Sequence, residues 1–159
     1  MSDVILNDVP MDLPAFTVKL AGLSGSPEGA ATAVIIGLAL MAMDSDLGWS
    51  CIQAADPSLP ASRRRFVEER LEGKKYLPNS YIVGTSPENR YRPQQPPLVI
   101  RFSTDPRSTE PASDRVKLFV ECTGADTPRP VTVARGADGR WTIVEWSSLL
   151  TGIRPPVSS

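Results

Sequence analysis

Tyrosine and arginine side chains gather in one segment of this 159-residue chain, and both types suit a recognition surface. All three tyrosines lie between residues 74 and 97, among asparagine, proline and arginine residues. Aromatic and guanidinium groups are enriched where proteins contact partners. The segment therefore predicts a binding surface for a protein partner or a ligand. Its alternative is a structural loop whose tyrosines pack on a sheet. The candidate binding residues are Asn79, Tyr81, Glu88, Asn89, Arg90 and Tyr91.

A carboxylate near the C-terminal end is the main candidate for acid–base chemistry. Trp141, Ile143 and Glu145 alternate along an expected strand and therefore share one face. If that face lines a cavity, burial would raise the pKa of Glu145 and suit it to proton transfer. A glutamate near a strand end more often reaches water. Arg129 is a further candidate binding residue, and Asp126 is expected to pair with it.

The residue types present exclude several kinds of reaction centre. The chain has no histidine and only two cysteines, Cys51 and Cys122, which we expect to be buried thiols. Histidine-based triads and four-cysteine zinc sites are therefore excluded. The signatures of phosphate-binding loops and of the serine-hydrolase elbow do not occur. We predict no catalytic residue, no metal and no cofactor, and we favour a non-catalytic protein over an enzyme.

The net charge argues against a nucleic-acid-binding protein. There are 17 basic and 18 acidic side chains, for a net charge of −1. The charge is unevenly distributed, because residues 1–60 carry seven acidic and one basic side chain while residues 61–159 carry eleven and sixteen. The two parts should attract each other, either within one molecule or head to tail between copies.

The sequence indicates a single α+β domain over residues 1–159. Helices are expected first, then a polar loop and antiparallel strands, with the helices packed on a curved, cone-like sheet. Ser26, Pro27 and Glu28 form a strong helix start. The expected elements are an extended arm at 1–14, a strand at 16–20, helices at 27–43 and 63–72, a break or short helix after 44, a strand at 81–83 within an irregular connection, strands at 98–103, 116–122, 131–134 and 141–146, a mobile loop at 104–114 and a flexible tail at 154–159.

No membrane-spanning segment is expected. The most apolar run, residues 29–43, has 15 residues, whereas a bilayer requires about 20. The first 14 residues carry three aspartates and no basic residue, which is unlike a secretory signal. These features predict a cytoplasmic protein.

Two groups of motifs together resemble an uncharacterised bacterial domain-of-unknown-function family. The resemblance covers about residues 60–156 and implies no activity. The motifs are Tyr76-Leu77-Pro78-Asn79-Ser80-Tyr81 with the 84–89 segment, and Lys117-Leu118-Phe119-Val120 with the 124–130 segment and the 141–156 region.

More remotely, the order of helices, loop and long hairpins resembles the cone-shaped fold of nuclear-transport-factor and ketosteroid-isomerase relatives. The hairpin that ends in Asp138-Gly139-Arg140-Trp141 carries this similarity. The resemblance implies a curved sheet, a helix-lined cavity and frequent dimers. It does not imply steroid-isomerase chemistry.

The sequence thus predicts a non-catalytic protein-binding or assembly module that self-associates. One alternative is a small-molecule-binding or enzymatic pocket at the wide end of the cone, built from Glu145, Trp141 and Tyr81. Another is an accessory or immunity protein of a bacterial secretion system.

Overall fold

The computed structural model describes residues 1–104 and 114–157 and confirms an α+β fold with an antiparallel sheet. The expected loop at 104–114 lies almost wholly outside the described residues. The elements in chain order are β1 (Ser2–Leu6), α1 (Leu13–Leu23), α2 (Pro27–Met43), α3 (Ser45–Ala55), the 3₁₀ turn η1 (Ala61–Arg63), α4 (Arg64–Leu71), η2 (Leu77–Tyr81), β2 (Leu98–Thr104), β3 (Arg115–Val120), β4 (Arg129–Arg135), β5 (Trp141–Glu145) and η3 (Ser147–Leu150).

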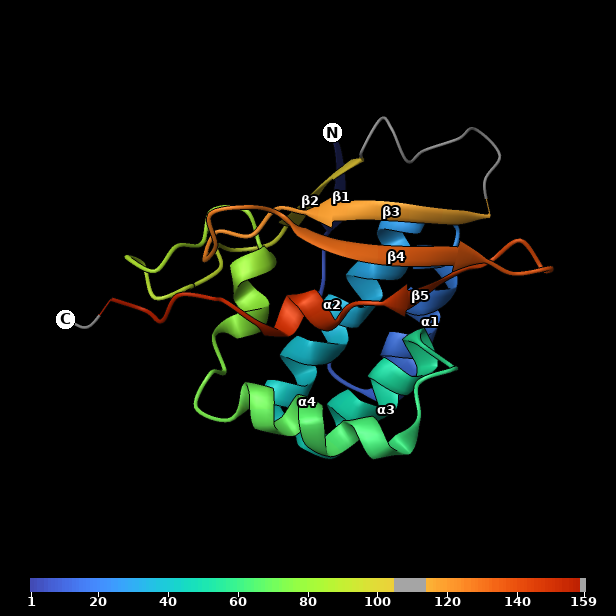
Figure 1. Cartoon of the computed structure of the whole chain (residues 1–159), viewed down its shortest axis with the longest axis horizontal. Coiled ribbons are helices and arrows are strands. Elements are labelled where there is room, and N and C mark those ends of the chain that lie inside the picture. The colour runs from blue at the N-terminus through green and yellow to red at the C-terminus, as the bar shows by residue number, and fades with distance from the viewer. Residues whose placement is uncertain (105–113, 158–159) are drawn as a thin grey trace.

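The sheet has five strands in the order β1-β2-β3-β4-β5, and every neighbouring pair is antiparallel. β1 and β5 are therefore its edges. The apolar side chains of alternate positions point to one face, as Leu98, Ile100 and Phe102 do in β2. Figure 1 shows the helices on that face, with α2 beneath the sheet and α4 farther away.

Helix α2 forms the centre of the core. Its start agrees with the sequence prediction, because Ser26 accepts a hydrogen bond from the Gly29 N–H at 3.0 Å. Twelve of its 17 residues are buried, and it contacts α1, α3 and four strands. α3 approaches so closely that a Cβ on Gly48 would lie 2.1 Å from the Met41 Cα. Only glycine fits at that crossing.

The strand expected at 16–20 is wrong, because these residues belong to α1. Asp12 caps this helix by accepting from the Ala15 N–H at 2.8 Å, and Pro14 occupies its first turn. The alternation of Phe16, Val18 and Leu20 spans only five residues. Such a short pattern cannot outweigh a capped helix start.

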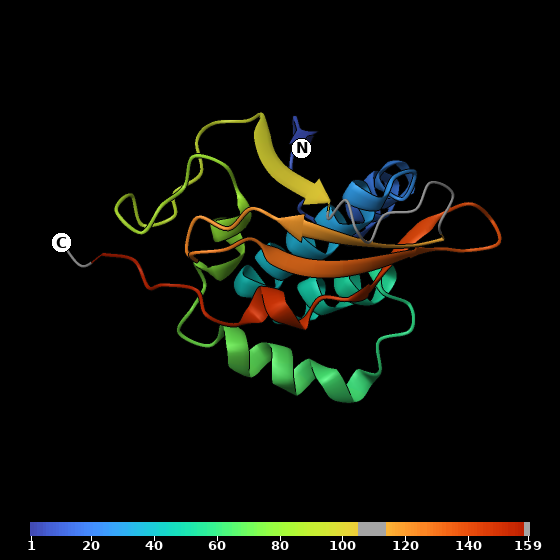
Figure 2. The same cartoon turned by 45° about the horizontal axis from the view of Figure 1, so that its top comes forward.

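Of three further segments, the expected strand at 81–83 is wrong, and the two terminal segments make contacts that the sequence did not predict. The strand expected at 81–83 is absent among the described residues; η2 ends there, and the Val83 N–H donates a single bond to the Val99 carbonyl. Within the expected extended arm at 1–14, Ser2–Leu6 are extended and form β1, which pairs with β2, while α1 already begins at Leu13. The C-terminal segment is anchored as far as Val157, whose N–H donates to the Pro87 carbonyl at 2.9 Å. Figures 1 and 2 both place this segment beside the irregular 82–97 connection.

Both cysteines are unpaired and buried, as the sequence predicts. Burial raises the pKa of the Cys51 thiol to about 11. A thiol with this pKa is protonated at neutral pH and is a poor nucleophile.

Candidate functional site

Two of the predicted binding tyrosines are buried in the core. Tyr81 and Tyr91 are 1% and 0% exposed. The Tyr81 hydroxyl donates to the Leu149 carbonyl at 2.6 Å, and the Tyr91 hydroxyl donates to the Arg154 carbonyl at the same distance. Tyr91 also stacks on Tyr76, with ring centroids 5.3 Å apart. Neither tyrosine is accessible to a partner, and burial raises the pKa of both.

Arg129 binds the same C-terminal segment as the two tyrosines. Its Nη2 donates to the carbonyls of Thr151 and Gly152 at 2.9 and 3.0 Å. Gly152 has a φ of +73°, and a Cβ there would lie 2.4 Å from that Nη2. We name Tyr81, Tyr91 and Arg129 the Tyr–Arg cradle. The structure thus brings three predicted binding residues together, and they hold residues 149–154 of their own chain.

The ion pair expected between Asp126 and Arg129 is wrong. Asp126 pairs instead with Arg154, with an Oδ1–Nη1 distance of 2.7 Å. Arg129 is directed to the 151–152 carbonyls, so the neighbour in sequence is not the partner in space. The Asp126 pair adds a surface contact to the same C-terminal segment.

The remaining candidates of the 79–91 segment shape turns or reach solvent. The Asn79 carbonyl accepts from the Thr85 hydroxyl at 2.8 Å. The Asn89 side chain accepts from the Ser86 N–H and donates to the Gly84 carbonyl. Glu88 and Arg90 are exposed beside them. Asparagine side chains commonly set turns in this way, so the alternative of a structural loop describes these contacts well.

Trp141 and Glu145 do not form one site. The Arg135 guanidinium carbon lies over the Trp141 ring, 5.4 Å from its centroid, and the main-chain N–H of Trp141 donates to the Ser24 carbonyl. Glu145 is exposed and accepts from both the hydroxyl and the N–H of Ser147, at 2.6 and 2.9 Å. These hydrogen bonds lower the pKa of Glu145, and the nearby Arg63 acts in the same direction. The raised pKa that burial would have given is therefore not found.

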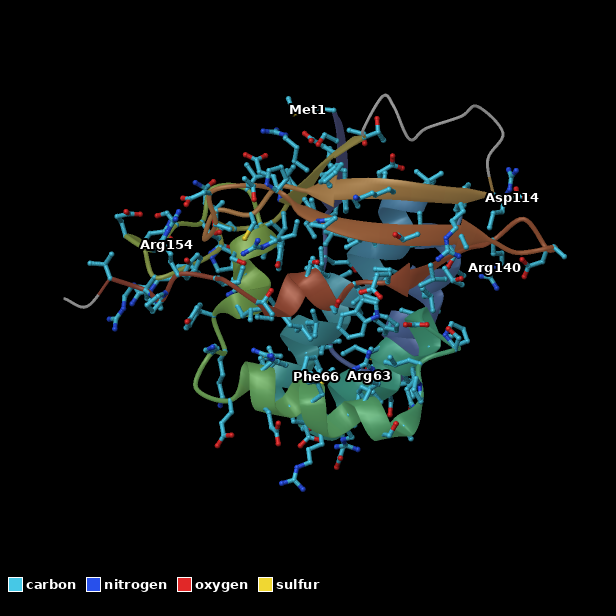
Figure 3. All side chains as sticks on the ribbon, in the orientation of Figure 1. Met1, Arg63, Phe66, Asp114, Arg140 and Arg154 are labelled. Carbon is cyan, nitrogen blue, oxygen red and sulfur yellow. The ribbon has the colours of Figure 1, made fainter. Side chains whose placement is uncertain are left out.

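Glu145 does border a cavity of about 170 Å³, which we name the Asp56 pocket. One wall comes from Asp56, from residues 58–60, from Arg63 and from the start of α4. The other comes from the end of β5 and from η3. Figure 3 shows Arg63 and Phe66 between α4 and the C-terminal turn. Neither Trp141 nor Tyr81, the other two residues of the predicted pocket, belongs to it.

Asp56 is the most deeply buried polar residue of this wall, with 3% of its surface exposed. One carboxylate oxygen accepts from the Ser58 hydroxyl and the other from the Trp146 indole N–H, each at 3.0 Å. Sequence reasoning missed this residue. Trp146 lies 90 positions away along the chain, so only folding brings the donor to the acid.

Among the described residues, the acidic part of the chain (1–60) and the basic part (61–159) form ion pairs within one molecule at two places. Arg101 of β2 donates to both Asp3 oxygens, at 2.8 and 3.0 Å, and Arg64 pairs with Asp46. Arg101 thereby lowers the pKa of Asp3. The charge distribution allowed attraction either within one molecule or head to tail between copies. These two contacts are of the first kind.

Large apolar side chains are exposed mainly near the N-terminus. Seven such residues occur in the described part of the chain, and five of them lie within residues 1–18. We name these five the N-terminal apolar residues. They stand on β1, on α1 and in the connection between them. The five are Met1, Ile5, Met11, Leu13 and Val18.

Residues 1–104 and 114–157 contain neither a cluster of metal-ligating side chains nor a membrane-spanning helix. Across this part of the chain, no three histidine, cysteine, aspartate or glutamate side chains converge as a metal site would require. Within the same ranges, no helix has both the length and the apolar character needed to cross a membrane.

Comparison with known proteins places the chain in a family without assigning an activity. No curated protein and no solved structure matches it. A family model does match, over residues 9–157, and therefore covers nearly the whole chain. This range includes the Tyr–Arg cradle and the Asp56 pocket. The chain belongs to the family described as Domain of unknown function (DUF6935).

Proposed function

We propose that the protein is a non-catalytic assembly module that pairs with a second copy of itself through the free edge of β1. The observation that carries the proposal is the exposure of the N-terminal apolar residues. Met1 is 95% exposed and Ile5 is 59% exposed, and both belong to the edge strand or adjoin it. Exposed apolar surface beside an unpaired strand edge gains stability when a partner covers it.

The backbone of β1 supports the same proposal. β1 pairs with β2 on one side only, and along residues 1–7 no backbone hydrogen bond reaches any other described segment. An open strand edge presents unpaired N–H and C=O groups that a second strand can satisfy. Two copies related by a two-fold axis would join their sheets edge to edge.

The charge on β1 is compatible with pairing of identical strands. An antiparallel pair centred on Val4 would set Asp3 opposite Ile5 of the second copy, so the two aspartates would not face each other. The Asp3 carboxylate is already bound by Arg101 of the neighbouring strand. Like-charge repulsion across such an interface is therefore weak.

The reactive groups of the described residues also support a role without catalysis. A general acid or base works best with a pKa near the working pH. Burial raises the pKa of Tyr81 and of Cys51 away from neutrality, and Ser147 lowers the pKa of Glu145. None of these three groups is poised for proton transfer or nucleophilic attack at neutral pH.

Sedimentation across a dilution series tests the proposal. The unmodified chain should change from dimer to monomer on dilution. Ile5→Glu should shift this equilibrium towards monomer by about tenfold or more, because in both symmetry-related contacts it replaces an apolar side chain with a carboxylate opposite Asp3. Met43→Glu is the matched control, since Met43 is 64% exposed but lies at the end of α2. A strict monomer at every concentration, or equal effects of the two variants, would contradict the proposal.

Two finer expectations accompany this proposal. The first is a cytoplasmic location, which fits two free cysteines in a chain of this size. The second is kinship with the cone-shaped fold, which stays a prediction because no solved structure matches. Its support is the antiparallel sheet with helices on one face.

A further inference from the structure

The Asp56 pocket carries an inference that is independent of self-association. Asp56 is the only aspartate, glutamate, lysine or arginine that is buried in the described part of the chain. A buried carboxylate is costly unless hydrogen bonds and a positive charge compensate it. The required hydrogen bonds come from Ser58 and Trp146. No lysine or arginine of residues 1–104 and 114–157 forms an ion pair with it.

The one guanidinium of the pocket wall is already engaged elsewhere. Arg63 lies over the Phe66 ring, 5.6 Å from its centroid, and its charge favours the ionised form of Glu145. Arg70 lies over the same ring at 5.0 Å. The wall therefore contains two carboxylates and one guanidinium, and Asp56 is the carboxylate whose charge has no partner.

The geometry points to a small organic cation, with a guanidinium or primary ammonium head, as the ligand of the Asp56 pocket. Each Asp56 oxygen accepts one bond from the protein and retains capacity for another, so a head with several N–H donors can bind both. Phe66, Val67 and Leu150 supply apolar surface for the carbon atoms of the ligand.

The size and composition of the pocket restrict this ligand. A volume of about 170 Å³ is close to that of a cavity able to hold one benzene molecule, about 150 Å³. The ligand therefore has only a few non-hydrogen atoms within the pocket. A divalent metal fits poorly, because Ca²⁺ and Mg²⁺ require six or more oxygen ligands and much of the wall is apolar.

Methylguanidinium and N-methylurea form a matched pair of probes, because they share a shape and differ in charge. Each is titrated into the ¹⁵N-labelled full chain at constant chloride concentration while the indole N–H resonance of Trp146 is followed. This N–H donates to Asp56 and so reports directly on its carboxylate. Methylguanidinium should shift the resonance saturably, and N-methylurea should bind at least about tenfold more weakly. Equal binding of the two probes, or no shift with the cation, would overturn the inference.

Two variants locate the binding. Asp56→Asn should weaken methylguanidinium binding by about tenfold or more, whereas Asp138→Asn removes an exposed carboxylate on the β4–β5 turn and should leave it unchanged. If Asp56→Asn does not fold, Val144→Phe is used instead. This substitution places a larger side chain in the pocket wall and retains Asp56, so it should also weaken methylguanidinium binding. Unchanged binding in folded Asp56→Asn, or in Val144→Phe, would refute the site.

Self-association through β1 and cation binding in the Asp56 pocket can be tested independently of each other. The titration is repeated on Ile5→Glu, which alters the β1 edge and leaves the pocket wall intact. Cation binding should be the same in this variant as in the unmodified chain. Binding that disappears with Ile5→Glu would mean that the pocket is not the site.

Discussion

The Tyr–Arg cradle and the Asp56 pocket differ in what their polar groups bind. In the cradle, both tyrosine hydroxyls and the Arg129 Nη2 donate to main-chain carbonyls of residues 149–154. In the pocket, a buried carboxylate receives two donors, has no ion pair in the described residues and borders a cavity. The sequence analysis identified the three residues of the cradle as candidates, whereas it did not identify Asp56.

The comparison shows that residue types suited to binding a partner can instead bind other parts of their own chain and stabilise the fold. Tyrosine and arginine are effective partners for carbonyl groups wherever these occur, including those of the same chain. Carbonyls at the end of η3 and in the irregular residues 151–154 that follow it must be satisfied by side chains or water. The cradle meets this need, so its composition reflects stability.

The largest expected effect comes from the cradle. Tyr91→Ala should lower the free energy of unfolding by about 3–5 kcal/mol, because it removes a fully buried aromatic ring together with its bond to the Arg154 carbonyl. Urea denaturation of the purified chain measures this change. Glu88→Ala, an exposed position in the same segment, should change stability by less than about 0.5 kcal/mol. Equal effects of the two would mean that Tyr91 is not part of the core.

An intermediate effect is expected in the pocket. Trp146→Phe retains an aromatic ring and removes the donor to Asp56, so we expect a loss of about 1–3 kcal/mol. The same urea experiment measures it. Because the remaining partner of Asp56 is Ser58, the double variant Trp146→Phe with Asp56→Asn should be less destabilised than the sum of the two single variants. Strict additivity would argue that the indole and the carboxylate do not interact.

The smallest effect concerns the pH dependence that Glu145 confers. Its native pKa lies below the ordinary value of 4.5, so the unfolded chain binds more protons in acid. The contribution of Glu145 to stability is therefore present above about pH 4.5 and is lost as the pH falls through the native pKa. Glu145→Gln should flatten the acid side of the stability profile slightly, as urea midpoints from about pH 3 to 6 would record. A steeper acid side in the variant would reverse the sign of this argument.

Local signals in the sequence predicted much of the fold. Ser26-Pro27-Glu28 marked the start of α2, because the capping residue and the first turn are neighbours in sequence. The alternation of β2 and β3 and the turn before β5 were also readable, because each depends on neighbours within a few residues. The segment 16–20 was misjudged since its five residues fit either a strand or a helix.

The sites required information that no local pattern contains. The Tyr81 hydroxyl bonds to a carbonyl 68 residues away, and Asp56 receives an indole N–H from 90 residues away. These contacts form because α2, buried on nearly all sides, fixes where the sheet and the other helices lie around it. The sequence by itself determined the α+β class, the start of the central helix and the lack of histidine chemistry. Only the tertiary structure decided that Tyr81 and Tyr91 face inward and that a buried carboxylate, Asp56, borders a cavity, because burial and hydrogen-bond partners depend on elements distant in the chain.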